Sequence, residues 1–401
     1  MTDALTLSET TGPTGPPLRD LTIGGLLREV AEQVPDRLAL VAGVPDPAGR
    51  REWTYAELLA ETERAARALR ALFEPGERVA LWAPNLPQWI MLEFACGMAG
   101  VILVTVNPGF QARELQYVLN QSRAAGLIVL PEFRGNPMLG TATDVQPECP
   151  ELREIIRLDE WDDFLASGDA WDGDLVDPDP MDPCMIQYTS GTTGFPKGAL
   201  LHHRGLVNNG THTADRMGAT DGSVYVLVMP LFHTGGCVLG TLSAVSKRMT
   251  IVLVEMFDPG LVLELTETYR GAGMLGVPTM LVALLEHPDF ATRDLSSVEA
   301  ICSGGSTVPA ALVERLEREL EAPFTIVFGQ TELSPVSSMT HTTDTIADKA
   351  STIGTAMPHV DVKIIDPETG DTVPTGTVGE YCARGYLVMH GYYEMPDATA
   401  E

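Results

Sequence analysis

Basic side chains are scarce in this sequence. It carries 26 Lys and Arg against 55 Asp and Glu, which gives a formal net charge of −29 over 401 residues. A surface of that sign repels nucleic acid and anionic membranes, so neither is expected as a partner. A polyanionic small molecule is also repelled at long range, but screening over about 8–10 Å in physiological salt lets a few local donors overcome that field.

The sequence also lacks long apolar runs, paired cysteines and common motifs of hydrolases and zinc enzymes. The longest apolar run, residues 94–106, is too short to span a bilayer, and the first four residues do not resemble a secretion signal. Six widely spaced cysteines without a C-x-x-C pair indicate free thiols in a reducing compartment, so we expect a cytoplasmic protein. Without H-E-x-x-H, a Cys/His cluster or G-x-S-x-G, neither a zinc site nor a serine hydrolase is expected.

The order of predicted elements indicates an α/β fold with more than one subdomain. Predicted strands and helices alternate, which is typical of mainly parallel sheets covered by helices. We therefore expect two mainly parallel sheets layered with helices, plus a smaller β-rich subdomain. The predicted division is a disordered leader (1–20), a first α/β subdomain (21–175), a second α/β subdomain (184–345) and a β-rich subdomain (350–401).

Periodicity and turn residues place the individual elements. The predicted helices are 55–72, 86–99, 114–121, 261–269, 279–286 and 309–320. The predicted strands are 79–82, 101–106, 126–130, 224–229, 250–254, 273–277, 298–302, 324–328, 360–365 and 379–383.

One glycine-rich segment, residues 188–198, has the composition of a phosphate-binding loop. It follows a short apolar run and combines glycines, hydroxyls and one lysine: Thr189, Ser190, Gly191, Thr192, Thr193, Gly194 and Lys197. Glycines let backbone N–H groups turn toward an anion, hydroxyls add donors, and lysine adds positive charge. Pro196 and Gly198 replace the second glycine and the Ser/Thr of a Walker loop, which excludes that motif. The alternative is an exposed polar turn, but a linker needs neither the lysine nor the entering strand.

This segment resembles the phosphate loop of the adenylate-forming superfamily, which includes acyl-CoA synthetases, luciferases and peptide-synthetase adenylation domains. The resemblance runs from about residue 25 onward and implies the fold of the N-terminal domain of an acyl-CoA synthetase. It also implies ATP, Mg²⁺ and CoA as ligands, and is compatible with a homodimer. Residues 334–336, 384–389 and 391–393 resemble the fatty-acid-activating branch, closest to medium-chain-type enzymes.

Two further loops follow predicted strands and carry site residues by resemblance. In residues 302–306, Gly304, Gly305 and Ser306 resemble the adenine-binding segment of the family, although alone they would also fit a tight turn. Residues Phe328, Gly329, Gln330, Thr331 and Glu332 resemble its tyrosine-glycine-x-threonine-glutamate motif, with phenylalanine in place of the tyrosine. The resemblance implies that Phe328 stacks on adenine, that Thr331 contacts the α-phosphate and that Glu332 binds Mg²⁺; an isolated loop of this kind would be an ordinary polar one.

Residues 230–236 resemble a family segment that lines the acyl pocket. An isolated histidine there would more often have no catalytic role, but the resemblance places His233 near the substrate carboxylate or at the entrance of the acyl channel. Amino-acid-activating relatives carry an aspartate in this segment, and this chain has none. The resemblance therefore implies a carboxylic acid without an α-amino group.

The function implied is that of an ATP-dependent acid–thiol ligase that adenylates a carboxylate and then forms a CoA thioester. Lys197, His233, Thr331 and Glu332 are its expected catalytic residues. Family members continue beyond Glu401 with a ribose-binding aspartate, a hinge and a C-terminal lid that carries a catalytic lysine. We therefore expect an N-terminal domain with poor activity of its own. The alternatives are a binding module for acyl-adenylate or AMP without turnover, and an aryl-activating or luciferase-like enzyme.

Overall fold

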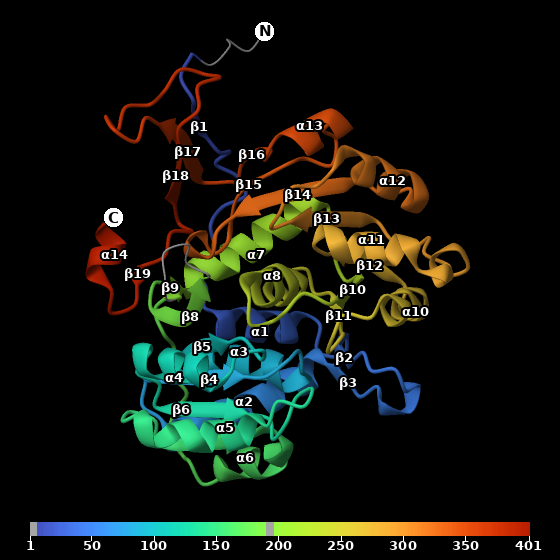
Figure 1. Cartoon of the computed structure of the whole chain (residues 1–401). Helices are drawn as coiled ribbons and strands as arrows, with labels where there is room; N and C mark the ends of the chain where they lie inside the picture. Colours follow the sequence, from blue (N-terminus) through green and yellow to red (C-terminus); the bar gives the residue numbers. More distant parts are fainter. Residues whose placement is uncertain (1–5, 190–195) are drawn as a thin grey trace.

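The structure is a computed structural model that describes residues 6–189 and 196–401. Within these residues the strands form three sheets, and the α/β class is confirmed (Figure 1). A 7-stranded sheet has the order β19-β9-β8-β5-β4-β6-β7, a 9-stranded sheet has the order β16-β15-β14-β13-β12-β10-β11-β2-β3, and a 3-stranded sheet has the order β1-β17-β18. Both large sheets are parallel in the centre and antiparallel at one or both edges.

The strands have the following bounds. The 7-stranded sheet contains β4 (Arg78–Trp82), β5 (Ile102–Val106), β6 (Gly126–Val129), β7 (Glu154–Arg157), β8 (Pro183–Thr189), β9 (Lys197–His202) and β19 (Gly391–Tyr392). The 9-stranded sheet contains β2 (Leu38–Ala42), β3 (Glu52–Thr54), β10 (Val224–Leu227), β11 (Thr250–Leu253), β12 (Gly271–Leu275), β13 (Ala300–Gly304), β14 (Phe324–Gly329), β15 (Val336–Met339) and β16 (Thr355–Ala356). The 3-stranded sheet contains β1 (Glu9–Thr11), β17 (Val360–Ile365) and β18 (Glu380–Gly385).

The helices fill the space between the two large sheets and cover their outer faces. Figure 1 shows α1 (Ile23–Gln33), α3 (Pro87–Ala99), α7 (His203–Met217) and α8 (Thr234–Gly236) between the sheets. The remaining helices are α2 (Tyr55–Leu72), α4 (Ala112–Gln121), α5 (Met138–Val145), α6 (Trp161–Ser167), α9 (Ser243–Ser246), α10 (Pro259–Tyr269), α11 (Pro278–Glu286), α12 (Ala310–Leu320), α13 (Ile346–Ser351) and α14 (Pro396–Ala400). A π-helix (Cys237–Leu242) joins α8 to α9.

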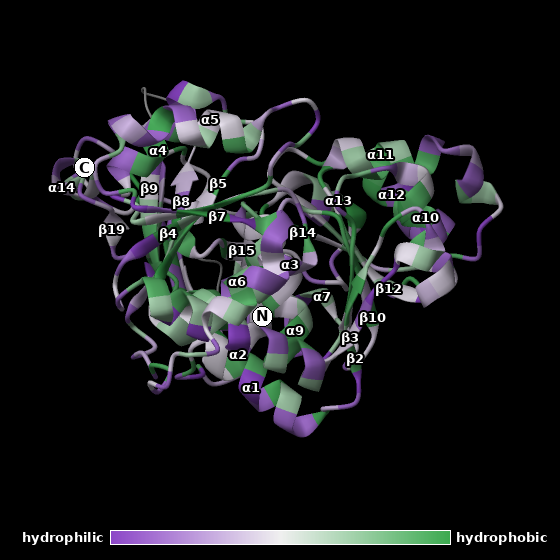
Figure 2. Cartoon of the chain, turned by 90° about the horizontal axis from the view of Figure 1, so that it is seen from below, coloured by the Kyte–Doolittle hydropathy of each residue, from purple (hydrophilic) through white to green (hydrophobic). Residues whose placement is uncertain are grey.

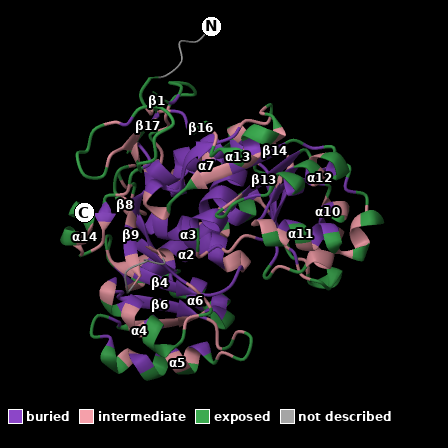
Figure 3. Ribbon diagram, turned by 45° about the horizontal axis from the view of Figure 1, so that its top comes forward, coloured by how far each residue is buried: buried purple, intermediate pink, exposed green. Residues whose placement is uncertain are grey.

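Each face of each large sheet packs against apolar side chains. The largest core lies between the sheets and includes α1, α2, α3 and α7. A second core joins α10, α11 and α12 to the outer face of the 9-stranded sheet, and a third joins α4 and α5 to the outer face of the 7-stranded sheet. Figure 2 accordingly shows hydrophobic strands, and outer helices that carry both hydrophobic and hydrophilic residues. Figure 3 shows that the buried residues are concentrated in the centre of the molecule. Burial on both faces explains the continuous apolar strands of the sequence.

The local sequence explains where several helices begin. At α2, the Thr54 side chain accepts a hydrogen bond from the Glu57 backbone N–H at 3.2 Å, and the Glu57 carboxylate accepts one from the Thr54 N–H at 2.8 Å. This capping box satisfies two N–H groups that a helix start leaves unpaired. The prediction of a helix over 55–72 is confirmed.

Several elements differ from the sequence prediction, and three of these differences affect the architecture. Residues 9–11, predicted to be disordered, form β1 and pair with β17, because an extended Thr-rich segment can hydrogen-bond to an open sheet edge. Residues 184–189 and 197–202, assigned to the second subdomain, lie in β8 and β9 of the 7-stranded sheet. Strands β2 and β3 lie in the range assigned to the first subdomain but join the 9-stranded sheet. Helix α7 was not predicted because it is rich in Gly, Asn, Thr and His, which are weak helix formers; burial between the sheets stabilises it instead.

Among the described residues, no helix combines the length and the apolar character needed to cross a membrane. The six cysteines are free thiols, and all except Cys382 are buried.

Candidate active site

The carboxyl ends of β10, β12, β13 and β14 surround a cavity of about 400 Å³, which we call the apolar pocket. Loops after neighbouring parallel strands converge at this edge, where ligands bind in open α/β folds. Its lining is mostly hydrocarbon, and includes Met229, Phe232, Leu239, Leu275, Met280 and Val336. A hydrocarbon group fits this lining better than a charged one.

A second cavity, which we call the polar pocket, has a volume of about 450 Å³ and adjoins the apolar pocket. Its short polar side chains include Ser306, Thr307, Ser351 and Thr352. Gly305 and Gly329 line both pockets, and Gly304 lines the apolar pocket. A molecule with one apolar end and one polar end can therefore extend from one pocket into the other past these glycines.

Glycine is required at both positions of this junction. Gly305 has a φ of +75°, which side chains other than glycine rarely adopt. A Cβ on Gly329 would lie 1.8 Å from the carbonyl oxygen of Pro335. A larger residue would strain the backbone at Gly305 and collide with it at Gly329, so the course of the backbone at the junction depends on glycine at both positions.

Phe328 lies in the wall of the polar pocket, as expected from its place before Gly329. Its ring packs edge-on against Tyr381, with centroids 5.2 Å apart and an interplanar angle of 77°. The Tyr381 hydroxyl is in turn within hydrogen-bond distance of the Ser337 and Ser338 hydroxyls, at 3.0 and 3.1 Å. The contact with Tyr381 thus fixes the orientation of the Phe328 ring.

Three side chains from distant parts of the chain meet at the end of β14. The Tyr392 hydroxyl donates a hydrogen bond to the Glu332 carboxylate at 2.6 Å, and the Lys197 ammonium lies 4.9 Å from the centroid of the Tyr392 ring. Burial, reinforced by the Glu332 carboxylate, raises the pKa of the Tyr392 hydroxyl, so Tyr392 remains a donor at neutral pH. The structure thus brings two predicted residues, Lys197 and Glu332, to the ring and the hydroxyl of one tyrosine that was not assigned to the site from the sequence.

Backbone hydrogen bonds hold this arrangement in place. The Met389 N–H donates to the Glu332 carbonyl at 2.9 Å, and the Tyr393 N–H donates to the Gly198 carbonyl at 2.8 Å. Strand β19 therefore lies beside β9, with Tyr392 opposite Ala199. The segment around β19 connects the loop after β14 to the strand that carries Lys197.

The remaining predicted residues of the two loops are placed as follows. Thr189 ends β8 directly opposite Lys197 in the antiparallel pair. Ser190, Gly191, Thr192, Thr193 and Gly194 lie outside the described residues. Gln330 is exposed, and Thr331 begins a 3₁₀ turn, Thr331–Leu333, that also carries Glu332.

His233 lies at the mouth of the apolar pocket and caps α8. Its Nδ1 accepts a hydrogen bond from the Gly235 N–H at 3.0 Å. Although the residue is exposed at the surface, the protein packed around its ring lowers the pKa of the imidazole, so the ring is neutral at pH 7. The accepting Nδ1 places the proton of the neutral ring on Nε2, which leaves a hydrogen-bond donor at the pocket mouth.

Asn85, which the sequence analysis did not single out, fixes the segment that carries His233. Its side-chain NH₂ donates to the carbonyls of Met229 and Val254 at 3.1 Å each, and its Oδ1 accepts from the Leu231 N–H at 2.8 Å. Asn85 follows β4 of the 7-stranded sheet, whereas its partners follow strands of the 9-stranded sheet. It therefore positions one wall of the apolar pocket from the opposite sheet.

A buried carboxyl group lies behind the π-helix. Glu93 of α3 is 1% exposed, and neither of its carboxylate oxygens has a hydrogen-bond partner. Burial raises the pKa of this carboxyl well above its usual range, and the nearby Thr241 hydroxyl offsets that only in part. Burial thus favours the protonated form of the Glu93 carboxyl in the folded protein.

The single carboxylate of Glu332 fits a Mg²⁺ ion that takes most of its other oxygen ligands from a bound phosphate and from water. No group of three or more His, Cys, Asp or Glu side chains in 6–189 and 196–401 could hold a metal by itself. One carboxylate completed by phosphate oxygens and water is a normal Mg²⁺ environment.

Comparison with known proteins identifies the family. The AMP-binding enzyme family matches residues 27–393. The chain is 37% identical to the YngI protein of Bacillus subtilis (strain 168), described as an acyl-CoA synthetase, over 94% of this chain and 73% of that protein. It is 33% identical to the mitochondrial medium-chain acyl-CoA ligase ACSF2 of Bos taurus, over 97% of this chain and 68% of the relative.

Solved structures establish the fold. The N-terminal domain of FACL13 from Mycobacterium tuberculosis matches with a TM-score of 0.83 at 24% identity, over 95% of this chain and 93% of that one. The long-chain-fatty-acid-CoA ligase FadD1 from Archaeoglobus fulgidus matches with a TM-score of 0.86 at 24% identity, over 98% and 81%. The chain therefore belongs to the AMP-binding enzyme family, among relatives that are acyl-CoA synthetases, and has the fold of their N-terminal domain.

Proposed function

We propose that this chain belongs to an ATP-dependent, AMP-forming ligase that converts a fatty acid into its CoA thioester. The observation that carries the proposal is the junction at Gly305 and Gly329, where the apolar pocket meets the polar pocket. An acyl-adenylate has this division, with a hydrocarbon chain at one end and a nucleotide at the other. The Lys197–Tyr392–Glu332 group, whose Glu332 lies three residues after Gly329 in the sequence, supplies charges suited to phosphate and Mg²⁺.

The proposed reaction has two steps. A carboxylate oxygen of the acid attacks the α-phosphorus of ATP, the bond to the bridging oxygen breaks, and pyrophosphate leaves. The CoA thiol, having lost its proton, then attacks the acyl carbon and displaces AMP. The protein contributes chiefly by positioning the reactants and stabilising charge that develops on phosphate oxygens.

Individual residues have distinct proposed roles. Lys197 neutralises charge on the phosphates, and the Thr331 hydroxyl donates to an α-phosphate oxygen. Glu332 would hold Mg²⁺, which, when bound, withdraws charge from the phosphate oxygens. The Nε2–H of His233 would donate to the substrate carboxylate at the pocket mouth, and Phe328 would pack against adenine. Residues 189–194 would surround the pyrophosphate.

The proposed substrate is an unbranched acid of medium length without an α-amino group. The apolar lining of the pocket supports the hydrocarbon chain, and the segment from Pro230 to Gly236 has no aspartate to pair with an ammonium group. The name of the Bos taurus relative, a medium-chain acyl-CoA ligase, agrees with this choice. A cytoplasmic location and a homodimer remain predictions.

We also propose that the chain is the large N-terminal domain of such a ligase and forms thioester poorly without the C-terminal lid. A binding module without turnover is the second candidate. The decisive measurement is pyrophosphate release from ATP with straight-chain, cyclic and aromatic acids, followed by thioester formation with CoA. We expect pyrophosphate release with medium straight-chain acids and little thioester. Binding of a stable acyl-adenylate analogue with no pyrophosphate release would favour the module instead, and thioester formation at the rate of a complete ligase would overturn the lid proposal.

A further inference from the structure

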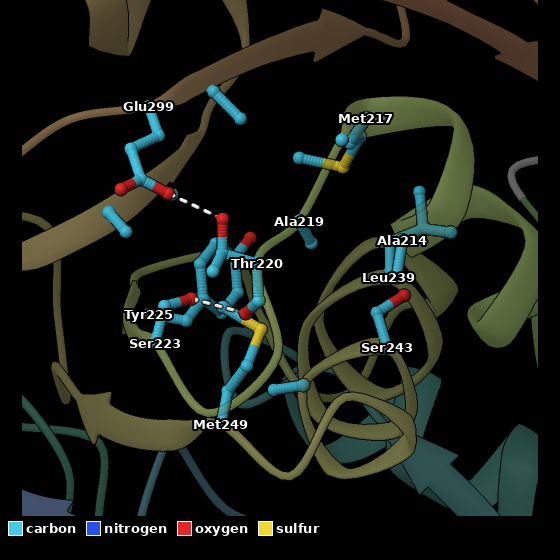
Figure 4. Close-up of a pocket in the computed structure, with 15 residues that line it drawn as sticks. Ala214, Met217, Ala219, Thr220, Ser223, Tyr225, Leu239, Ser243, Met249 and Glu299 are labelled. Atoms are coloured by element: carbon cyan, nitrogen blue, oxygen red, sulfur yellow. Dashed lines mark hydrogen bonds between the residues drawn. The ribbon is translucent and has the colours of Figure 1, made fainter.

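A third cavity lies on the same face of the 9-stranded sheet as the apolar pocket. This cavity, which we call the rear chamber, has a volume of about 20 Å³, and its lining includes Tyr225, Leu239, Ser243, Met249, Gly273 and Ala300 (Figure 4). It lies at the amino ends of β10, β12 and β13, whereas the apolar pocket lies at their carboxyl ends. At that size it holds little more than one methyl group or water molecule.

The strands show that the two cavities are aligned. On β12, Gly273 lines the rear chamber and Leu275 lines the apolar pocket. Residues two apart point to the same face of a sheet and are about 6.6 Å apart along a parallel strand. On β13, Ala300 and Gly304 repeat this arrangement. The two cavities therefore follow one another along a single strip of the sheet.

Leu239 separates them. Its side chain lines both cavities, and no other residue of the described part of the chain is shared by the two linings given above. Leu239 is 5% exposed and belongs to the π-helix that packs over the sheet. π-helical turns often occur at functional sites because the extra residue redirects a side chain. Here the turn places one leucine between the pocket and the chamber.

The far end of the rear chamber reaches the surface. The Thr220 hydroxyl donates to the Glu299 carboxylate at 2.6 Å, and the Ser223 hydroxyl donates to the Thr220 carbonyl at 2.8 Å (Figure 4). Thr220 and Glu299 are exposed, whereas the buried hydroxyl of Tyr225 has no partner. Beyond Leu239 there is thus a small apolar cavity with polar groups on its surface side, rather than solid core.

We propose that Leu239 sets the upper limit of acyl-chain length by closing the apolar pocket, and that the rear chamber becomes its continuation when that side chain is shortened. This inference rests on the proposed function. The ligand class is an unbranched acyl chain whose terminal methyl group meets Leu239. Each methylene that enters an apolar site strengthens binding about fourfold. Affinity therefore rises with chain length until the terminal carbon reaches Leu239, and then stops rising.

The test uses acyl-sulfamoyladenosines, which are stable acyl-adenylate analogues, with acyl chains from 6 to 16 carbons. Their dissociation constants are measured by calorimetry on the chain itself, so the readout does not depend on turnover. Leu239→Ala is expected to move the chain length of maximum affinity upward by at least two carbons, with a gain of about tenfold for the longer analogue over the wild-type protein. Leu239→Phe is expected to move the maximum downward.

Leu242→Ala is the matched control, because Leu242 lies on the same π-helix and is fully buried, but lines neither cavity. If Leu239→Ala does not fold, Leu239→Val removes a single carbon and is expected to shift the maximum by about one carbon. The role of Leu239 is overturned if the dissociation constants of the wild-type protein depend on chain length but Leu239→Ala and Leu242→Ala both have their affinity maximum at the wild-type chain length. Failure of every analogue, and of AMP, to bind the wild-type protein overturns the proposed function instead.

Discussion

The two sides of the junction at Gly305 and Gly329 are built on different physical principles. On the phosphate side, Lys197, Tyr392 and Glu332 hold one another through charge and hydrogen bonding. On the acyl side, the pocket is formed by glycines and by hydrocarbon side chains that include Leu239 and Leu275. Charged groups can change a reaction rate without altering shape, whereas apolar walls select by volume. Rate and substrate choice should therefore respond to different substitutions.

The largest expected effect is on the phosphate side. Lys197→Ala or Glu332→Gln should lower the rate of pyrophosphate release about 100-fold or more, because each removes charge stabilisation at the phosphates. The preferred chain length should stay the same. Lys363→Ala, which removes a lysine from the 3-stranded sheet, should leave the rate unchanged. A shift in chain-length preference caused by Lys197→Ala would show that the two sides are not separable.

A smaller effect is expected where the two sheets meet on the acyl side. Asn85→Ala leaves two carbonyls and one N–H buried without partners, which should cost about 2–4 kcal/mol in the free energy of unfolding. Because the wall of the apolar pocket that carries His233 should then be displaced, the KM for the acid should rise about tenfold. The KM for ATP should not change. Urea denaturation and steady-state kinetics measure the two effects. The exposed Asn120→Ala is the control, and an equal rise in both KM values would contradict the separation.

Tyr392→Phe tests whether the hydrogen bond between Tyr392 and Glu332 contributes to the phosphate side. The substitution keeps the ring beside Lys197 but removes the hydrogen bond to Glu332, so pyrophosphate release should fall roughly 3- to 10-fold. Tyr393→Phe, its neighbour, is the matched control. A requirement for higher Mg²⁺ concentration in Tyr392→Phe but not in the control would support a positioning role for the hydroxyl. Identical Mg²⁺ dependence and rate in both variants would argue against it.

The smallest effect on activity is expected for Glu93→Gln, because Glu93 is buried behind the π-helix and does not line the apolar pocket. Burial raises the pKa of Glu93 in the folded protein. The unfolded chain therefore loses this proton above its ordinary pKa of about 4.5, whereas the folded protein keeps it. Wild-type stability should consequently fall as pH rises from about 5, by up to about 1.4 kcal/mol per pH unit from this group.

Glutamine has no proton to lose, so the stability of Glu93→Gln relative to the wild-type protein should increase from pH 5 to pH 8. Urea denaturation at each pH measures the difference, with the exposed Glu132→Gln as a control for the lost charge. A difference that stays constant from pH 5 to pH 8 would show that the pKa of Glu93 is not raised in the folded protein.

Local signals were sufficient for most of the framework. The helix over 55–72 has its own capping box and apolar face, and the strand over 360–365 has its own β-type sequence, so both were predicted with their observed bounds. Helix α7 consists largely of weak helix formers such as Gly, Asn, Thr and His, and forms because the surrounding sheets bury it. Sheet membership was also beyond local signals, since β2 and β11 are paired across about two hundred residues.

The site divides in the same way. Lys197 and Glu332 were found because each belongs to a compact motif, and the structure brings both to Tyr392. Tyr392 itself lies 60 residues from Glu332, and Asn85 lies 146 residues from Leu231, so their contacts depend on tertiary packing. Leu239 looks like any core leucine in the sequence. Only the two cavities on either side of it distinguish its position.

The short strand β19 has a practical consequence for protein engineering. Through it, the backbone of residues 389–393 pairs with β9 and with the loop that carries Glu332. A version of the chain shortened before Met389 would expose the edge of β9 and release both charged residues of the phosphate side. Such a protein would be prone to edge-to-edge association as well as inactive. Minimal versions of this domain should therefore retain every residue through Tyr393.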